Sequence, residues 1–141
     1  ITCAIGSFIS GRLSDRFSAR RVMVWILIGW TGLFPILSLL DSFYPFAVLL
    51  VMAGLLHGSV WTVSRALLFE LVPSHRLNLG SSYYTLTERF ATFIGPIGWS
   101  TVLSLSESYG ADRYRIALGS LTIFILLGLY TVNRITINKK P

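Results

Sequence analysis

The sequence predicts an all-α membrane protein, a polytopic bundle of transmembrane helices. Of its 141 residues, 53% are hydrophobic and only 13% are charged, whereas a soluble domain carries about a quarter charged residues. The apolar residues form long runs, and the basic residues form short clusters between those runs. A net charge of +6 distributed in this way is typical of membrane-flanking loops rather than of a nucleic-acid-binding surface, so no nucleic-acid partner is expected.

The spans are located by apolar runs of the length that a membrane helix needs, about 17–25 residues. The first run, residues 1–10, is too short to cross and lacks the features of a signal peptide, so it is interpreted as the end of a helix that begins before this chain. Four full spans and a polar tail are expected to follow, at about 22–40, 46–72, 79–105, 114–132 and 133–141.

The polar segments between the spans alternate in their content of Lys and Arg. Residues 11–21, residues 73–78 and the tail hold eight of them in total, whereas residues 41–45 and 106–115 hold two. Because basic residues concentrate on the cytoplasmic side of a membrane, the C-terminus is expected in the cytoplasm. The same rule assigns one set of residues to the cytoplasm (Arg20, His75 and Lys140) and another to the outside (Asp41 and Tyr109).

The first polar segment reads GRLSDRFSARR and starts at Gly11. Gly11 is expected to end the first helix close to a neighbouring helix, and the remaining residues are expected to form a tight turn. Within this turn, Asp15 is expected to cap a helix N-terminus or to pair with a basic group. On composition alone, an ordinary membrane-flanking loop explains the segment equally well.

The same segment resembles the G-x-L-x-D-R-x-G-R-R/K loop signature of the major facilitator superfamily (MFS). Ser18 stands where the signature has its second glycine, and Ala19 stands where it has a basic residue, so the copy is degenerate. The resemblance implies the second-half portion of a twelve-helix fold, from the end of helix eight to helix twelve. It also implies a gating loop, which consists of Gly11, Asp15, Arg16, Arg20 and Arg21.

Four further stretches, at 54–58, 64–73, 80–84 and 93–96, are similar in their order to the vacuole-effluxer-like branch of the MFS. Fungal members of that branch are associated with amino-acid export from the vacuole. The resemblance implies secondary active transport of a small solute by alternating access, with amino-acid efflux as the finer expectation. It implies the solute, the lipid bilayer and the missing N-terminal helices of the same protein as partners, and no cofactor. The bacterial inner membrane is the preferred location, and the vacuolar membrane is the alternative.

The span at 46–72 has a polar face that is visible without reference to any family. At 100° per residue, His57, Trp61 and Arg65 fall on one face together with Gly54 and Gly58. Two glycines four residues apart favour close packing of helices. Ionisable groups at membrane depth usually face a bundle interior or an aqueous cavity, which makes His57 and Arg65 candidate cavity residues. The alternative is that Arg65 extends along the helix to the cytoplasmic surface.

The span at 79–105 is expected to form an antiparallel hairpin with the preceding span. Glu88 is then expected at a depth similar to that of Arg65, and two interpretations stay open: a proton-coupling acid, or one half of a permanent salt bridge. The Gly95–Pro96 pair is expected to bend the helix and to serve as a hinge. The candidate substrate or coupling cavity consists of His57, Trp61, Arg65, Tyr84 and Glu88.

Two other classes of function compete with a transporter. A membrane-embedded enzyme needs a cluster of His, Asp or Glu, or a nucleophile with a base, and the sequence has two histidines and no HExxH, GxSxG or phosphate-binding loop. With Cys3 as the single cysteine, the sequence predicts neither catalytic nor metal-binding residues. The remaining alternative is a small four-helix membrane scaffold or assembly protein without transport activity, and eight further spans before residue 1 would favour the transporter.

Overall fold

The computed structural model describes residues 1–40 and 42–135, and all regular structure in them is helical. The predicted all-helical class is therefore confirmed for the described residues. The calls on Asp41, Lys140 and most of the tail at 133–141 lie outside the described residues. The described residues form five α-helices and two short 3₁₀ helices, in this order: α1 (Thr2–Phe17), α2 (Ala19–Leu39), α3 (Phe43–Leu71), η1 (Ser74–Arg76), α4 (Leu77–Leu105), η2 (Glu107–Asp112) and α5 (Arg113–Arg134).

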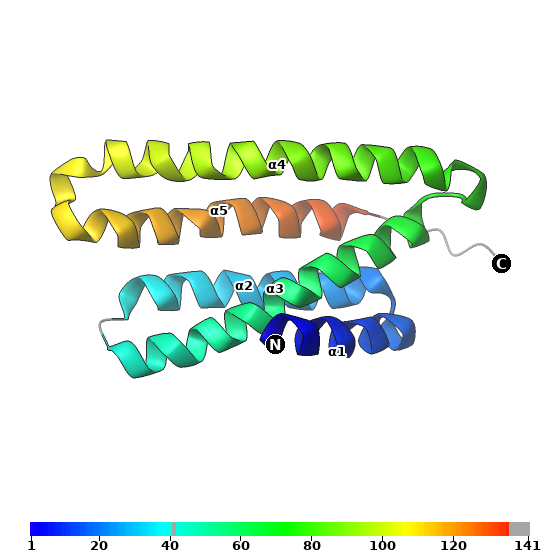
Figure 1. Cartoon of the computed structure of the whole chain (residues 1–141), viewed down its shortest axis with the longest axis horizontal. Coiled ribbons are helices and arrows are strands. Elements are labelled where there is room, and N and C mark those ends of the chain that lie inside the picture. Colours follow the sequence, from blue (N-terminus) through cyan, green and yellow to red (C-terminus); the bar gives the residue numbers. More distant parts are fainter. Residues whose placement is uncertain (41, 136–141) are drawn as a thin grey trace.

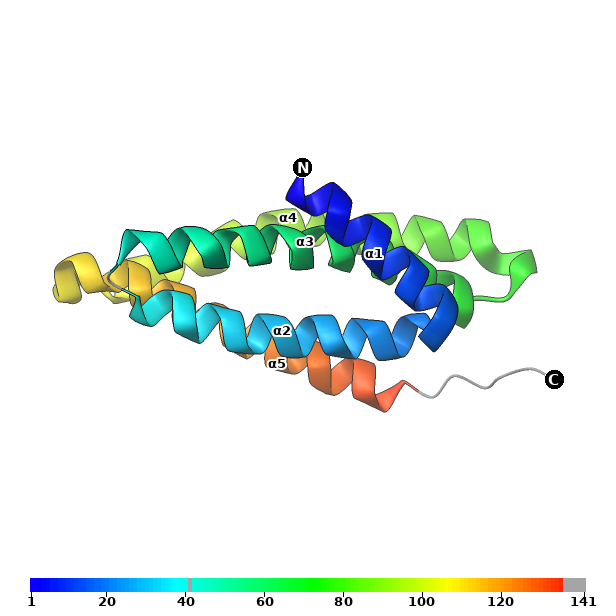
Figure 2. The same ribbon diagram turned by 90° about the horizontal axis from the view of Figure 1, so that it is seen from below.

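The helices run lengthwise through an elongated bundle, and successive helices reverse direction (Figure 1). The α1–α2 junction, the α3–α4 connection and the end of α5 lie at one end of the bundle, whereas the α2–α3 and α4–α5 connections lie at the other. The view in Figure 2 shows α2 and α5 together on one side and α1, α3 and α4 on the other. The first two segments that were expected on one side of the membrane, and the described start of the third, thus share one end of the bundle. Which side of the membrane that end occupies stays a prediction.

Among the described residues, three helical segments are long and apolar enough to cross a membrane: Ala19–Leu39, Phe43–Leu71 and Glu107–Arg134. The remaining expected span, 79–105, corresponds to α4, which has 29 residues but is too polar to join this group. Even so, α4 runs beside α5 and connects opposite ends of the bundle (Figure 1). Its length, about 42 Å at 1.5 Å per residue, also exceeds the roughly 30 Å of a bilayer core. A crossing α4 stays a prediction that the arrangement supports.

The first polar segment is not a loop, which corrects the expectation for residues 11–21. Helix α1 continues through Gly11 to Phe17, and Ser18 is the single residue between α1 and α2. Arg20 and Arg21 therefore belong to the first turn of α2. The physical reason is packing: α1 lies along α3 and buries Gly6, Ser10 and Ser14, small side chains that suit a close helix pair. Tertiary contact thus keeps a polar segment helical.

Small residues bring α1 and α3 together at backbone distance. A Cβ atom added at Gly6 would overlap the backbone of Leu55, and one added at Gly58 would overlap the backbone of Cys3. Hydroxyl groups bridge the same contact, because Ser59 Oγ donates to the carbonyl oxygen of Gly6 at 3.0 Å and Ser7 Oγ donates to that of Gly58 at 2.9 Å. The close packing expected for Gly58 is therefore what the structure shows.

The buried core lies where α2 meets α3, and it is small. Most large apolar side chains point outward, as expected for helices that meet lipid or further helices. Helix α4 buries none of its residues. The core cluster consists of Ala19, Val22, Met23, Ile26, Leu27, Val63 and Leu67.

Candidate transport site and helix junction

Three of the predicted cavity residues form a stack along α3. The indole Nε1 of Trp61 donates to Nε2 of His57 at 3.3 Å, and the guanidinium carbon of Arg65 lies 5.7 Å from the Trp61 ring centroid. Each step is four residues, so the contacts follow from helical periodicity. All three side chains are exposed, and Trp61 and Arg65 help to line an open pocket of about 460 Å³. Nothing in the described chain covers this face of α3.

The predicted partner of Arg65 lies on α4, but the two charges do not meet in this conformation. No ion pair or hydrogen bond joins Arg65 to Glu88 in the described residues. Instead, the hydroxyl groups of Ser64 and Tyr84 lie 2.9 Å apart and connect α3 to α4. The structure therefore brings Tyr84 to the residue next to Arg65, and the coupled charge pair stays a prediction.

The junction between α1 and α2 is held by an acid that sequence reasoning missed. Glu70, at the end of α3, accepts a hydrogen bond from the backbone N–H of Ala19 at 2.9 Å and a longer one from Ser18 Oγ at 3.4 Å. A carboxylate at the first turn of a helix satisfies a free N–H and interacts favourably with the helix dipole. Glu70 thus takes the capping role that was expected of Asp15.

Asp15 itself is exposed on the last turns of α1 and makes no hydrogen bond or ion pair to another described residue. Its expected role as a cap inside this chain is therefore not seen. The signal that points to Glu70 is its position: it is a lone acid at the end of an apolar run, at the same end of the bundle as the α1–α2 junction.

The arginines at this end divide into two groups. Arg20 donates from Nε to the carbonyl oxygen of Val132 at 3.2 Å and from Nη2 to that of Asn133 at 2.8 Å, so it caps the C-terminus of α5. Arg16 lies over the ring of Phe17 with 5.6 Å to the centroid, and Arg21 is exposed. The proposed gating set therefore contains one arginine engaged inside the chain and two that face outward.

The backbone conformation at Ser18 is one that favours glycine, the residue that the MFS signature has at this position. Its angles are φ 85° and ψ 135°, a combination that residues other than glycine rarely adopt. The substitution of Ser18 for the signature glycine therefore leaves local backbone strain at the junction.

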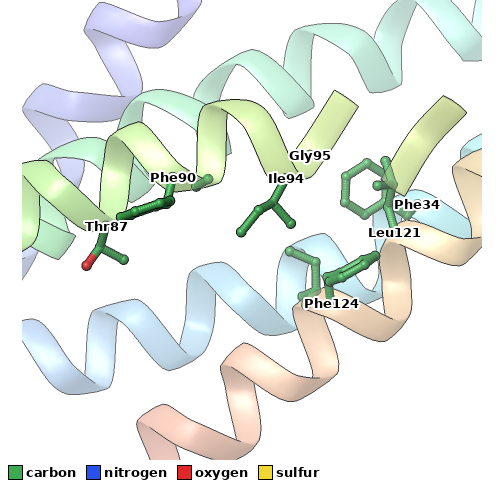
Figure 3. Close-up of a pocket in the computed structure, with 9 residues that line it drawn as sticks. Phe34, Thr87, Phe90, Ile94, Gly95, Leu121 and Phe124 are labelled. Atoms are coloured by element: carbon green, nitrogen blue, oxygen red, sulfur yellow. The ribbon is translucent and has the colours of Figure 1, made fainter. Parts of the chain in front are cut away.

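An apolar pocket of about 420 Å³ lies between α2, α4 and α5 (Figure 3). Thr87 contributes a hydroxyl, but that hydroxyl donates to the carbonyl oxygen of Tyr83 at 2.9 Å. The pocket thus offers no free polar group to a solute, and its lining suits apolar contacts. Gly95, one of the two expected hinge residues, also lies here, inside a helix that continues through Pro96. The lining is completed by Phe34, Phe90, Ala91, Ile94, Leu121, Phe124 and Ile125.

A metal site is not formed by the described residues, which hold no group of three or more His, Cys, Asp or Glu side chains.

Long apolar helices with ionisable side chains on an uncovered face define a polytopic α-helical membrane protein. The chain belongs to the Major Facilitator Superfamily, whose family model matches residues 1–139. The likeness to that family noted from the loop signature is therefore confirmed, and the protein is an integral membrane protein.

Several curated relatives carry transporter names. The chain is 25% identical over 136 residues to the "Low-affinity glucose transporter" of Kluyveromyces lactis, which covers 94% of this chain and 24% of that protein. It is 28% identical over 130 residues to the "Uncharacterized MFS-type transporter YfkF" of Bacillus subtilis, covering 89% of this chain and 33% of the relative. It is 35% identical over 78 residues to the "Probable 4-methylmuconolactone transporter" of Cupriavidus pinatubonensis, covering 54% of this chain and 18% of the relative.

The chain thus spans a third or less of the length of these relatives. No solved structure matches it significantly.

Proposed function

We propose that the protein containing this chain is a secondary transporter that moves a small solute by alternating access. The chain would supply helices eight (in part) to twelve of a twelve-helix fold. The observation that carries the proposal is the match of the MFS family model to residues 1–139, and the chain's own chemistry agrees with it. His57, Trp61 and Arg65 form a polar stack on an uncovered face of a helix apolar enough to cross a membrane. Such a face is costly against lipid and favourable beside water or solute.

Other residues of the same helix pack inside the chain, and they support this assignment. Gly58 and Ser59 pack on α1, and Val63 and Leu67 belong to the core with α2. Helix α3 therefore has one face committed to packing and another left free for a pathway. In alternating access the free face would line the cavity between two six-helix halves.

The junction residues support a gate at one end of the bundle. Glu70 and Arg20 tie α1, α2, α3 and α5 together, whereas Asp15, Arg16 and Arg21 face outward at the same end. The outward charges are suited to contacts that form and break with the other half of the protein during the cycle. Gly11 belongs to this gating set in our proposal, although its role inside α1 would be helix packing beside Thr62.

Amino-acid efflux is the finer proposal, and it rests on the likeness to the vacuole-effluxer-like branch. The test is counterflow of single radiolabelled amino acids in proteoliposomes that hold the full-length protein, with glucose as the matched control because one relative is named a glucose transporter. Accumulation of an amino acid but not glucose would support amino acids as the substrate class. Accumulation of glucose alone would overturn that substrate class. Folded protein that moves neither would count against this finer proposal and would favour the scaffold alternative.

The second test concerns Arg65 and Glu88, which we propose to couple in another conformation of the cycle. Arg65→Ala and Glu88→Ala are each expected to reduce transport. The double variant should be milder than the sum, with a coupling of about 0.5–3 kcal/mol. Glu107→Ala, an exposed acid on the far connection, is the control and should leave transport unchanged. Strict additivity in the cycle of variants would reject the coupling.

A further inference from the structure

Helix α4 carries a polar face that the proposed function has not used. Tyr83, Tyr84 and Thr87 lie on other sides of the helix, but the seven other polar side chains of α4 before Gly95 fall within an arc of about 120° at 100° per residue. Each of them is exposed or half-buried, and the opposite side of the helix supplies Phe90 and Ile94 to the apolar pocket. The polar face of α4 consists of Asn78, Ser81, Ser82, Thr85, Glu88, Arg89 and Thr92.

Arg89 is the outstanding group on this face. It lies about 18 Å from Leu77 and about 24 Å from Leu105 at 1.5 Å per residue, so it is close to the middle of α4. That distance is too long for its side chain to extend to either end of the helix. Ser81, Ser82, Thr85 and Leu86 line an open pocket of about 470 Å³ together with Arg89.

The guanidinium group of Arg89 makes no hydrogen bond or ion pair to another described residue. The neighbouring hydroxyls do not compete for an anion, because Ser82 and Thr85 donate to the carbonyl oxygens of Asn78 and Ser81 at 2.9 and 3.0 Å. Five N–H donors in a planar fork are therefore left for an external acceptor. At the middle of a membrane helix such a group is stable only beside water, an anion or an acid of another helix.

The charge on the uncovered faces is positive. The charged side chains there are Arg65 on α3 with Arg89 and Glu88 on α4, and no ion pair between described residues neutralises either arginine. Glu88 is the neighbour of Arg89 in sequence but points about 100° away from it. A cavity with an excess of positive charge attracts anionic solutes, and a guanidinium group binds a carboxylate with two parallel hydrogen bonds.

We propose that the polar face of α4 lines the aqueous solute pathway and that Arg89 is its anion-binding residue, with a carboxylate-bearing solute as the substrate class. The proposal rests on the transport function proposed above and names its substrate class. Zwitterionic amino acids belong to this class through their carboxylate.

The experiment measures thiol accessibility in the full-length protein after its native cysteines, including Cys3, are replaced by serine. Thr85→Cys introduces a thiol on the polar face, one turn from Arg89. Thr87→Cys is the matched control: it lies only about 3 Å further along the helix axis, its hydroxyl makes the same type of bond to a carbonyl four residues back, and it lines the apolar pocket. The probes are the anionic reagent MTSES and the cationic reagent MTSET, applied in membranes.

We expect Thr85→Cys to react with both reagents and Thr87→Cys to react with neither. The ratio of the anionic to the cationic rate at Thr85→Cys should exceed the ratio for a small free thiol. It should fall by about tenfold in Arg89→Gln and be retained in Arg89→Lys, because one nearby positive charge sets the local potential.

Two results would overturn the proposal. An unreactive Thr85→Cys would mean that protein or lipid covers the polar face. The second result is an anionic-to-cationic rate ratio at Thr85→Cys that equals the ratio for the free thiol, either with Arg89 unchanged or with Arg89→Lys. It would mean that Arg89 does not attract anions, and it does not depend on whether Arg89→Gln folds. Thiol labelling can be measured in a protein that transports nothing. If the labelling pattern is as expected but no counterflow is seen, the result rejects the proposed transport function and not the assignment of the polar face.

Discussion

Helices α1 and α4 flank α3 in very different ways. Helix α1 meets α3 at backbone distance, through glycines and hydroxyl bridges, and buries Gly6, Ser10 and Ser14. Helix α4 is nearly twice as long, buries no residue and connects to α3 mainly near one end. The α1–α3 contact is complete within this chain, whereas α4 presents surfaces that only something outside the described residues covers. Buried packing residues are therefore found on α1, whereas α4 carries residues of the pathway that we propose.

The largest effect is expected from disturbing the complete contact. Gly58→Ala in the full-length protein introduces a Cβ atom that overlaps the backbone of Cys3, so α1 and α3 must move apart. The expected loss is about 3 kcal/mol of stability, seen as a lower midpoint of unfolding in detergent. Gly128→Ala is the control, because the space around Gly128 is open and alanine favours a helix. Equal midpoints for the two variants would contradict the backbone contact.

The next effect concerns the capping acid. Glu70→Ala removes the acceptor of the Ala19 N–H and should destabilise the protein by about 1–2 kcal/mol, whereas Glu70→Gln should lose less because its amide oxygen still accepts. The unfolding midpoint measures both. Glu107→Ala serves as the control at the other end of the bundle. Equal unfolding midpoints for Glu70→Ala and Glu107→Ala would show that the cap formed by Glu70 does not stabilise the protein.

A gain is expected at the junction residue. Ser18→Gly relieves a backbone conformation that only glycine adopts freely, at the expense of a 3.4 Å hydrogen bond to Glu70. The net stabilisation should be about 1 kcal/mol, read as a higher unfolding midpoint. Ser106→Gly at the end of α4, where φ is −102°, is the matched control and should gain nothing. A lower midpoint for Ser18→Gly would show that the hydroxyl matters more than the strain.

The smallest effect on stability is expected at Asp15. Asp15→Asn changes an exposed carboxylate that contacts no other described residue through a hydrogen bond or ion pair, so the unfolding midpoint should stay within about 0.5 kcal/mol of the unmodified protein. We expect the transport cycle to slow nevertheless, because the gating role proposed for Asp15 lies outside this chain. Unchanged transport, with a normal distribution of inward and outward states, would return Asp15 to an ordinary surface residue.

The sequence predicted the helices that apolar runs define, since length and hydropathy are strong signals for a membrane helix. It failed at residues 11–21, where the polar composition suggested a loop and the fit of small side chains against α3 keeps the chain helical. It also missed Glu70, whose partners are 51 and 52 residues away and leave no periodic trace. The sequence analysis did not include Arg89 among the cavity residues because Arg89 points about 100° away from Glu88. Both residues nevertheless belong to the polar face of α4, which spans about 120°.

The one-residue junction at Ser18 has a mechanical consequence. A connection of one residue leaves little freedom for a change in the angle between α1 and α2. Two sets of hydrogen bonds restrain the same corner of the bundle: Glu70 of α3 bonds to the start of α2, and Arg20 bonds to the end of α5. We therefore expect four helices to pivot as one stiff corner when the two halves rock. Bending would then be confined to elements that this corner does not hold, and we expect it in α4, which has Gly95 and Pro96 inside the helix.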